Sequence, residues 1–283
     1  MSEESIVWIN GEHMPANEVP LSIFDLGVAV GLGVFETLIA YRGVMPSFNL
    51  HMDRFQSAAA IVKLNLPPQE IMMEAVMQTL AVNDLTENKR VRVRITLGAG
   101  EHLVAAKQVS RAVENYLIIS AVPQNAPAPH AELAVVPMRC NEHGALAGVK
   151  TTSYAENILA YRHAAKQGGD EAVMLNTSGH LCECSMSNLF LVKDSEVLTP
   201  SLSSGCLPGV TRSTVLELCR GNQIPVKQLD LTEGDLFSAD EIFITSSARE
   251  VQPARMVGSS LEFPGAITKL LADEYRVYIE EEL

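Results

Sequence analysis

Residues 148–160 read GVKTTSYAENILA and contain the start of a predicted helix. Ser153 and Glu156 predict a capping box, in which the hydroxyl and the carboxylate bind N–H groups in the first turn of a helix. The box precedes the apolar positions Ile158, Leu159 and Tyr161. The helix is expected to end near Gly168 and Gly169, because paired glycines favour a turn.

Lys150 lies just before this predicted helix and is the only charged residue in residues 144–155. Uncharged surroundings disfavour the ammonium form, and the positive end of the helix dipole adds to that effect. Schiff-base chemistry requires a neutral amine, so Lys150 is a candidate catalytic residue. The alternative is an ordinary lysine whose aliphatic stem is covered and whose head lies in water.

Two stretches further along the chain have features of phosphate-binding sites. Residues 207–212 read LPGVTR and lead into a predicted helix, where a glycine lets the backbone approach and the N–H groups of the first turn point outward. Residues 244–248 read ITSSA, where a predicted strand ends in consecutive hydroxyl groups. A plain helix start and a serine-stabilised turn are the alternative interpretations.

Two single charged residues are further candidates. Arg54 follows His51 on a predicted helix and is suited to a bidentate clamp on a phosphate, with a surface ion pair as the alternative. Glu183 is the only charge between His180 and Lys193 and lies in a predicted strand. A buried carboxylate needs a cationic partner, either a protonated ring nitrogen or a nearby arginine.

The composition excludes several classes of protein. The chain has 283 residues, 47% of them hydrophobic, and a net charge of −13. Disorder is not expected, and the acidic surface argues against nucleic acid and anionic membranes as partners. We expect no transmembrane or signal segment, and an odd cysteine count, 5, indicates reduced thiols in the cytoplasm. No metal site is expected, because Cys182-x-Cys184 lacks a second pair or a nearby histidine.

An uncharged, proline-rich stretch at residues 123–129, PQNAPAP, is the best candidate for a linker. It predicts an N-terminal α/β domain over residues 1–122, a linker over residues 123–130 and a C-terminal domain over residues 131–283. Local patterns in the first domain predict an Asn10-Gly11 hairpin turn, helices over 50–64 and 70–82, and strands over 33–41, 90–97 and 116–122. In the second domain they predict strands over 132–138, 171–175, 181–184, 188–192, 196–198 and 241–245, and helices over 210–220 and 266–282.

Several longer motifs resemble, in the same order, those of the class IV (fold-type IV) pyridoxal-phosphate-dependent aminotransferase family. The motifs are FDLGVAVGLGVFETL (24–38), HMDRFQSA (51–58), GVKTTSYAENILA (148–160), GDEAVMLNTSGHLCECSMSN (169–188), LTPSLSSGCLPGVTR (198–212) and FITSSAREVQP (243–253). The family contains branched-chain aminotransferases, D-amino-acid aminotransferases and aminodeoxychorismate lyases. The resemblance covers residues 8–257. It implies an α+β fold of two domains, a smaller N-terminal α/β domain and a larger C-terminal domain with a mixed sheet or pseudo-barrel.

Carried over residue by residue, the resemblance implies that Lys150 is the catalytic residue and forms a Schiff base with pyridoxal 5'-phosphate. Glu183 would face the pyridine nitrogen, and Tyr154 the phenolic oxygen of the cofactor. The other residues that the resemblance places at the cofactor are Arg54, Leu207, Gly209, Val210, Thr211, Ser246 and Ser247. Those that it places at the substrate carboxylate are Phe35, Ser247 and Ala248.

The implied activity is amino-group transfer between an amino acid, branched-chain or related, and a 2-keto acid. The alternative in the family is an aminodeoxychorismate lyase, which forms 4-aminobenzoate and pyruvate with the same lysine and cofactor. A protein that only binds the cofactor is disfavoured by Lys150, because simple binding requires no nucleophile. The resemblance also implies a homodimer that binds small amino acids and keto acids.

The sequence departs from the family's substrate motifs in three places. Cys184 stands where many relatives carry glycine. The Arg-x-His pair of D-amino-acid enzymes is missing from residues 97–102, and the Tyr-x-Arg pattern of branched-chain enzymes is replaced by Arg90-Val91-Arg92. The motifs therefore leave the substrate and its stereochemistry open.

Overall fold

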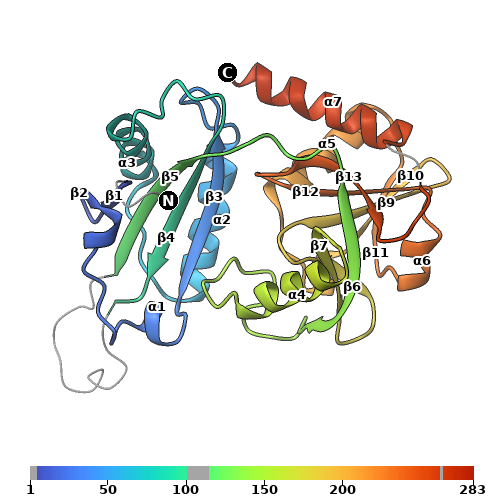
Figure 1. The fold of residues 1–283 in the computed structure, drawn as a ribbon, viewed down its shortest axis with the longest axis horizontal. Coiled ribbons are helices and arrows are strands. Elements are labelled where there is room, and N and C mark those ends of the chain that lie inside the picture. Colours follow the sequence, from blue (N-terminus) through green and yellow to red (C-terminus); the bar gives the residue numbers. More distant parts are fainter. Residues whose placement is uncertain (1–4, 101–114, 262–263) are drawn as a thin grey trace. The chain divides into compact units, whose positions relative to one another are not determined.

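A computed structural model describes residues 5–100, 115–261 and 264–283. The chain divides into two compact units (Figure 1). Unit 1 comprises Met1–Asn125, Val149–Tyr154 and Leu283, and unit 2 comprises Ala126–Gly148 and Ala155–Glu282. Part of the region 97–102, from which the Arg-x-His motif is missing, lies outside the described residues.

Unit 1 is built on a five-stranded antiparallel sheet. In the order β2-β1-β5-β4-β3 across the sheet, its strands are β2 (Glu12–Pro15), β1 (Ile6–Ile9), β5 (Tyr116–Pro123), β4 (Val91–Gly98) and β3 (Gly33–Ala40). Asn10 and Gly11 form the predicted turn between β1 and β2, with φ angles of 47° and 103°. Asn-Gly pairs favour hairpin turns because both residues tolerate a positive φ.

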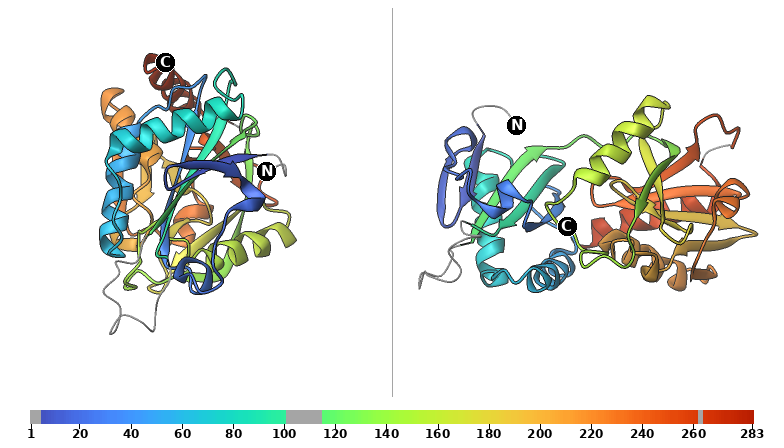
Figure 2. Two further views of the ribbon diagram at one scale, coloured as in Figure 1. Left: turned by 90° about the vertical axis from the view of Figure 1, so that its left-hand side faces the viewer. Right: turned by 90° about the horizontal axis from the view of Figure 1, so that it is seen from below.

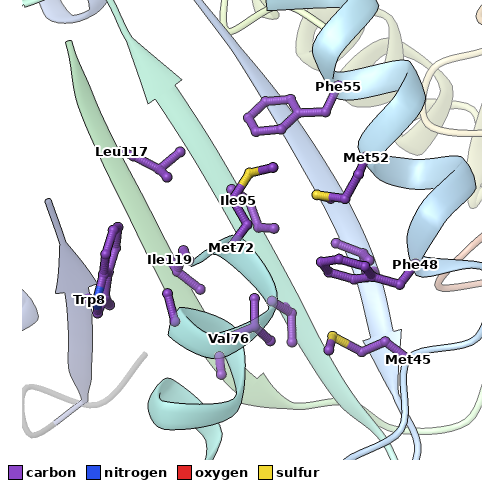
Figure 3. Close-up of a cluster of buried hydrophobic side chains, with 14 of the residues drawn as sticks. Trp8, Met45, Phe48, Met52, Phe55, Met72, Val76, Ile95, Leu117 and Ile119 are labelled. Carbon is purple, nitrogen blue, oxygen red and sulfur yellow. The ribbon is translucent and has the colours of Figure 1, made fainter. Parts of the chain in front are cut away.

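Two helices pack on one side of this sheet (Figure 2). They are α2 (Phe48–Ile61), against β3, and α3 (Gln69–Val82), against β1 and β5. The helices predicted over 50–64 and 70–82 are thus confirmed, with α2 ending three residues early at Ile61. The apolar core lies between helices and sheet and includes Phe48, Met52, Phe55, Ile95 and Ile119 (Figure 3). The sheet and its helices position β3, which carries the first part of the candidate site. Between α2 and the N-terminal hairpin lie the short elements η1 (Ala16–Glu18) and α1 (Leu26–Ala29).

Unit 2 is built on an eight-stranded mixed sheet. In the order β11-β10-β9-β12-β13-β6-β7-β8, its strands are β11 (Val226–Leu229), β10 (Glu196–Pro200), β9 (Asn188–Lys193), β12 (Glu241–Ser246), β13 (Glu250–Met256), β6 (Ala131–Cys140), β7 (Glu171–Asn176) and β8 (Leu181–Cys184). The pairs β10–β11, β13–β6 and β6–β7 are parallel, and the others are antiparallel. The end strand β8 also lies against β9 and β10, so the sheet curls on itself. This confirms the predicted α+β fold with a larger, mixed-sheet C-terminal part.

The helices of unit 2 pack against this curled sheet. They are α4 (Ala155–Lys166), on β6 and β7; α5 (Val210–Gly221), on β11 and β12; and α7 (Ala266–Glu281), on β12, β13 and α5. Short turns of helix occur at η3 (Leu202–Ser204) and α6 (Glu233–Phe237). No helix within residues 5–100, 115–261 and 264–283 is long and apolar enough to cross a membrane.

The capping box predicted at the start of α4 is wrong. The helix begins at Ala155, one residue later than the box requires. The Ser153 hydroxyl donates to the Gly31 carbonyl oxygen at 3.0 Å, because the residues before α4 pack on unit 1. The buried side chains of α4 are the small residues Ala160 and Ala164.

Candidate active site

Lys150 lies on the segment Val149–Tyr154, which is bound to β3 of unit 1. The Phe35 N–H donates to the Lys150 carbonyl oxygen at 2.9 Å. The Thr151 hydroxyl donates to the Gly33 carbonyl oxygen at 3.0 Å. These bonds fix the backbone of Lys150 against the sheet of unit 1, although α4, which follows in sequence, belongs to unit 2.

Two glycines allow this close approach. A Cβ on Gly33 would lie 2.6 Å from the Leu97 carbonyl oxygen and 2.9 Å from Thr152 Oγ1. A Cβ on Gly31, whose φ is 70°, would lie 2.7 Å from Ser153 Oγ. Close packing therefore explains the two glycines at residues 31 and 33.

The Lys150 side chain lies against two aromatic rings. Its Nζ is 4.4 Å from the centroid of Phe35 and 5.8 Å from that of Tyr154. The two rings make an edge-to-face contact, with their centroids 5.5 Å apart. Arg94 Cζ lies 3.7 Å from the Phe35 centroid. The structure thus brings together three predicted residues, Lys150, Phe35 and Tyr154, and adds Arg94, to which the sequence assigned no role.

Arg54 binds a buried carboxylate of the neighbouring strand. Its Nε and Nη2 donate to the two oxygens of Glu36 at 2.7 and 2.8 Å. His51, one turn earlier on α2, places Nδ1 2.9 Å from Glu36 Oε2. Sequence reasoning missed Glu36 and His51. The available signal was the spacing of His51 and Arg54, which puts both on one face of a helix and calls for a shared acidic partner.

The charges of this cluster determine its protonation. Burial by itself would raise the pKa of Glu36, but the Arg54 guanidinium and the hydrogen bonds from His51 and Arg54 lower it to about 2. Burial lowers the pKa of His51, and the nearby charges of Arg54 and Lys150 act in the same direction against the effect of Glu36. The cluster therefore contains an ionised Glu36, a cationic Arg54 and a neutral His51.

In unit 2, Glu183 lies on β8 between two buried thiols, Cys182 and Cys184. Its Oε2 accepts a hydrogen bond from the Leu207 N–H at 2.8 Å. The Leu207 carbonyl oxygen accepts another from the Asn188 side-chain amide at 2.8 Å. The predicted residues Glu183 and Leu207 are thus in direct contact. Cys184, which replaces the usual glycine, packs in the apolar core of the unit.

The backbone at the start of α5 is closely packed. A Cβ on Gly209 would lie 2.0 Å from Asn188 Oδ1, so only glycine fits without a shift. No side chain of the described residues caps the first turn of α5. The first N–H groups of a helix have no partner within the helix, so this end is suited to an anion. The Thr211 hydroxyl is buried, 3.4 Å from Tyr275 Oη.

The second predicted anion-binding stretch is the turn between β12 and β13. It contains Ser246, Ser247 and Ala248. The Ser246 hydroxyl accepts a hydrogen bond from the Arg249 N–H at 3.2 Å. Just before the turn, Thr245 Oγ1 is buried and has no hydrogen-bond partner within residues 5–100, 115–261 and 264–283. A buried hydroxyl without a partner is costly, so a bound ligand group would stabilise it.

A buried carboxylate, which the sequence analysis also missed, connects this turn with the end of β8. Glu171 accepts hydrogen bonds from the Met186 N–H at 3.1 Å and the Ser187 hydroxyl at 3.2 Å. Arg249 Nε lies 3.3 Å from the same carboxylate. Burial raises the pKa of Glu171, and Arg249 and the hydroxyl groups oppose this rise.

Each unit thus holds one group of the predicted site residues. Those in unit 1 are Phe35, Arg54, Lys150 and Tyr154. Those in unit 2 are Glu183, Leu207, Gly209, Val210, Thr211, Ser246, Ser247 and Ala248.

Comparison with known families accounts for this arrangement of residues. The family model described as "Amino-transferase class IV" matches residues 33–257, which include all of the predicted site residues. The chain belongs to the class IV aminotransferase family. A putative branched-chain-amino-acid aminotransferase of Methanocaldococcus jannaschii is 30% identical over 95% of both chains. An aminodeoxychorismate lyase of Bacillus subtilis is 28% identical over 88% of this chain and 85% of the lyase.

Solved structures agree with this membership. A branched-chain aminotransferase of Thermoproteus uzoniensis, solved with norvaline, is 28% identical and superposes with a TM-score of 0.89 over 98% of this chain and 95% of its own. A branched-chain amino acid aminotransferase of Thermobaculum terrenum, solved in its PLP form, shares the fold at 22% identity, with a TM-score of 0.85 over 100% of this chain and 96% of its own. The class IV aminotransferase is therefore an enzyme of amino-group transfer.

Proposed function

We propose that this enzyme transfers an amino group between an amino acid, branched-chain or related, and a 2-keto acid, using pyridoxal 5'-phosphate attached to Lys150. The observation that carries the proposal is the placement of the Lys150 amine, 4.4 Å from the Phe35 centroid on a backbone bound to β3. The similarity to the Methanocaldococcus jannaschii protein supports the choice of substrate.

The residues present fit such a cofactor. In unit 2, the uncapped start of α5, with Gly209, Val210 and Thr211, is suited to a phosphate. The buried Thr245 hydroxyl lacks a partner within the described part of the chain and lies next to Ser246 and Ser247, which we also assign to the cofactor.

In unit 1, we assign Arg54 to the cofactor phosphate. Its guanidinium is held in one orientation by the two hydrogen bonds to Glu36, at 2.7 and 2.8 Å. A guanidinium oriented in advance loses less conformational entropy when it binds an anion. Glu36 is accordingly a positioning residue for Arg54.

When bound, pyridoxal phosphate supplies an aldehyde that forms a covalent bond with amines and a ring that accepts the electron pair from the substrate α-carbon. The Lys150 amine holds the cofactor at rest. Once free, the Lys150 amine would take the proton from the substrate α-carbon as a base and would deliver it, as an acid, to the cofactor carbon that carried the aldehyde. The Phe35 and Tyr154 rings keep this amine in a defined position and reduce its contact with water.

Glu183 is assigned to the cofactor's pyridine nitrogen. A carboxylate there keeps a proton on that nitrogen, because opposite charges favour the protonated form. The Leu207 N–H, 2.8 Å from Glu183 Oε2, orients the carboxylate, and the Leu207 side chain is assigned to the face of the ring. Tyr154 is assigned to the phenolic oxygen, and Ser247 and Ala248, with Phe35, to the substrate carboxylate.

A label-based experiment tests the role of Lys150 without measuring turnover. Borohydride reduction of the enzyme with pyridoxal phosphate is expected to attach the cofactor to Lys150, as located by peptide mass mapping. Lys150→Ala should lose the label and the visible absorbance of the bound cofactor. Lys166→Ala, at the end of α4, is the matched control and should keep both. A Lys150→Ala protein that binds the cofactor with an unchanged spectrum contradicts the assignment.

The second candidate function is aminodeoxychorismate lyase, favoured by the 28% identity to the Bacillus subtilis enzyme. The purified enzyme is offered L-leucine, D-alanine and aminodeoxychorismate in parallel. Conversion of the cofactor to its pyridoxamine form by an amino acid indicates transamination, and leucine against alanine reports stereochemistry. Pyruvate release from aminodeoxychorismate without that conversion indicates the lyase.

We also propose that the enzyme is a cytoplasmic homodimer. Its described cysteines are all unpaired, as in a reducing compartment. A run of apolar side chains around α1 is exposed on unit 1: Leu21 40%, Ile23 76%, Phe24 73%, Val28 52% and Val30 58%. Concentrated apolar exposure of this kind marks an interaction surface, and a second copy of the chain is the proposed partner.

A further inference from the structure

The face of the unit 1 sheet opposite the helices carries two arginines of β4. Val91, Val93, Ile95 and Leu97 of this strand are buried in the core. Because side chains alternate along a strand, Arg92, Arg94 and Thr96 lie on the other face. On β3, Phe35 is opposite Thr96 and Thr37 is opposite Arg94. Arg94 is thus the diagonal neighbour of Phe35, within reach of its ring.

Arg94 lies close to the amine of Lys150. Its Cζ is 3.7 Å and the Lys150 Nζ is 4.4 Å from the centroid of the same ring, Phe35. These two distances limit the separation of Cζ and Nζ to at most about 8 Å. An amino acid whose nitrogen lies at Lys150 can therefore bring a carboxylate to this guanidinium, once the lengths of the hydrogen bonds at both ends are added to that of its carbon skeleton.

The guanidinium of Arg94 has hydrogen-bonding capacity to spare. Its Nε donates to Thr96 Oγ1 at 3.3 Å, and its two terminal nitrogens make no hydrogen bond to any residue of the described ranges. Within those same ranges Arg94 forms no ion pair with a carboxylate, in contrast to Arg54, whose charge is matched by Glu36. Burial lowers the pKa of Arg94, and the neighbouring charge of Arg92 lowers it further.

The guanidinium of Arg94 on the Phe35 ring, with that of Arg92 on the same strand face, creates a local positive potential in a protein whose net charge is −13. Like charges at this distance repel one another, so an anion placed among them is stabilised. A planar guanidinium stacked on a ring presents its edge for two parallel hydrogen bonds to a carboxylate.

We propose that Arg94 is the substrate-specificity residue of this enzyme and that its guanidinium, stacked on Phe35, binds a carboxylate group of the substrate. The inference rests on the proposed function, because it places the substrate nitrogen at Lys150. It supplies the basic group whose usual sequence signatures, Arg-x-His and Tyr-x-Arg, are missing. The carboxylate is either the side-chain carboxylate of a dicarboxylic amino or keto acid or the α-carboxylate shared by all amino acids.

The test compares Arg94→Met and Arg94→Lys with a matched control, Arg90→Met. Arg90 belongs to the same run of arginines and also lies over an aromatic ring, that of Tyr41, at 5.7 Å from its centroid, but it lies outside the pairing of β3 with β4, which ends at Val91. The Michaelis constants for L-leucine, L-alanine and L-glutamate are measured in single half-reactions, by conversion of the bound cofactor. Binding of succinate, which needs no turnover, is measured by calorimetry.

If Arg94 binds a side-chain carboxylate, Arg94→Met raises the KM for glutamate by about 10- to 100-fold and leaves leucine and alanine within about two-fold, from the usual strength of a charged hydrogen bond. If it binds the α-carboxylate, all three KM values rise together by about the same factor. In both cases succinate binds more weakly, and Arg94→Lys recovers part of the loss because it keeps the charge without the bidentate geometry.

Unchanged KM values and unchanged succinate binding in Arg94→Met overturn the proposal, and so does an equal fall in kcat for all substrates at constant KM. Arg90→Met should resemble the wild type in every assay. If the proposed function is wrong, a different set of results is expected: the wild type shows no borohydride label on Lys150 and no conversion of the cofactor by any of the three amino acids. The calorimetric binding of succinate then still decides whether Arg94 binds an anion.

Discussion

Replacing Arg54 with methionine should destabilise unit 1 much more than the loss of a surface ion pair. The substitution removes the guanidinium that donates to both oxygens of Glu36, at 2.7 and 2.8 Å. Glu36 is 0% exposed, so its charge stays buried, and within the described part of the chain its remaining hydrogen-bond partners are His51 and the N–H of its neighbour Thr37. Breaking one partner from a buried pair typically costs about 3–5 kcal/mol.

The pKa of Glu36 gives an independent value of the same size. Its fall from 4.5 to about 2 in the folded chain corresponds to about 3 kcal/mol of preferential stabilisation of the carboxylate. Because burial alone opposes this fall, the interactions of Glu36 with Arg54 and His51 together must exceed that net value, and the charge of Arg54 is the largest of them. We therefore expect Arg54→Met to lower the free energy of unfolding by about 3–5 kcal/mol at neutral pH.

The assay is urea denaturation of the protein without cofactor, so that phosphate binding makes no contribution. The single tryptophan, Trp8, is buried in the core of unit 1 and reports its unfolding by fluorescence. The matched control is Arg220→Met, which removes an exposed ion pair with Glu217 and should cost less than about 1 kcal/mol.

A double variant, Arg54→Met with Glu36→Leu, checks the mechanism. Once the carboxylate is gone, loss of Arg54 should cost little, so the two substitutions are expected to be non-additive by about 2 kcal/mol or more. A stability of Arg54→Met within about 1 kcal/mol of the wild type, or additive effects in the double variant, would show that Arg54 does not stabilise the buried charge of Glu36.

Three further predictions concern acid stability, the start of α5 and the association of the chain. Folding lowers the pKa of both Glu36 and His51, so the unfolded chain binds more protons than the folded chain, and the free energy of unfolding falls as the pH falls. His51 contributes to this fall below pH 6.5, and Glu36 contributes between pH 4.5 and about 2. His51→Gln should remove the upper part of this fall in urea titrations against pH; an unaltered profile would count against a neutral, buried His51. Gly209→Ala places a Cβ against Asn188 Oδ1, so it should lower the free energy of unfolding by about 1–3 kcal/mol and weaken the binding of pyridoxal phosphate. The control is Gly221→Ala at the other end of α5, where an added Cβ would have no neighbour within 4 Å, and it should be neutral or stabilising. Equal melting temperatures for the two variants would contradict this prediction. Phe24, whose side chain is 73% exposed, is replaced in Phe24→Glu, and this variant should sediment as a monomer in sedimentation velocity where the wild type sediments as a dimer. Glu70→Gln, at an exposed polar position on α3, is the control and should remain a dimer. A wild type that sediments as a monomer contradicts the proposed dimer.

Elements with strong local signals could be predicted from the sequence. The Asn10-Gly11 turn depends on two residues that tolerate a positive φ, and β4 shows strict alternation of arginine with aliphatic residues. The start of α4 was predicted wrongly, although its residues match a capping box. Ser153 bonds to Gly31 instead, a partner more than a hundred residues away that no local pattern includes.

The residues of the candidate site also fall into two groups, those that motifs could identify and those that only long-range contacts reveal. The residues to which the resemblance assigns chemistry, such as Lys150 and Glu183, could be named from motifs in a fixed order along the chain. The residues that hold them in place could not. Glu36 was missed because its partners lie on a separate helix, and Glu171 because its partners come from β8 and from the turn before β13.

Residue types in a fixed order along the chain were sufficient to predict the family, the α+β fold and a candidate for the catalytic amine, Lys150. Three contacts became visible in the folded chain alone: the segment with Lys150 binds to β3, Arg54 pairs with Glu36, and Arg94 stacks on Phe35. The physical reason is strand register. Backbone hydrogen bonds between strands set which distant side chains become neighbours, and the energy of those contacts exists only once the strands are paired.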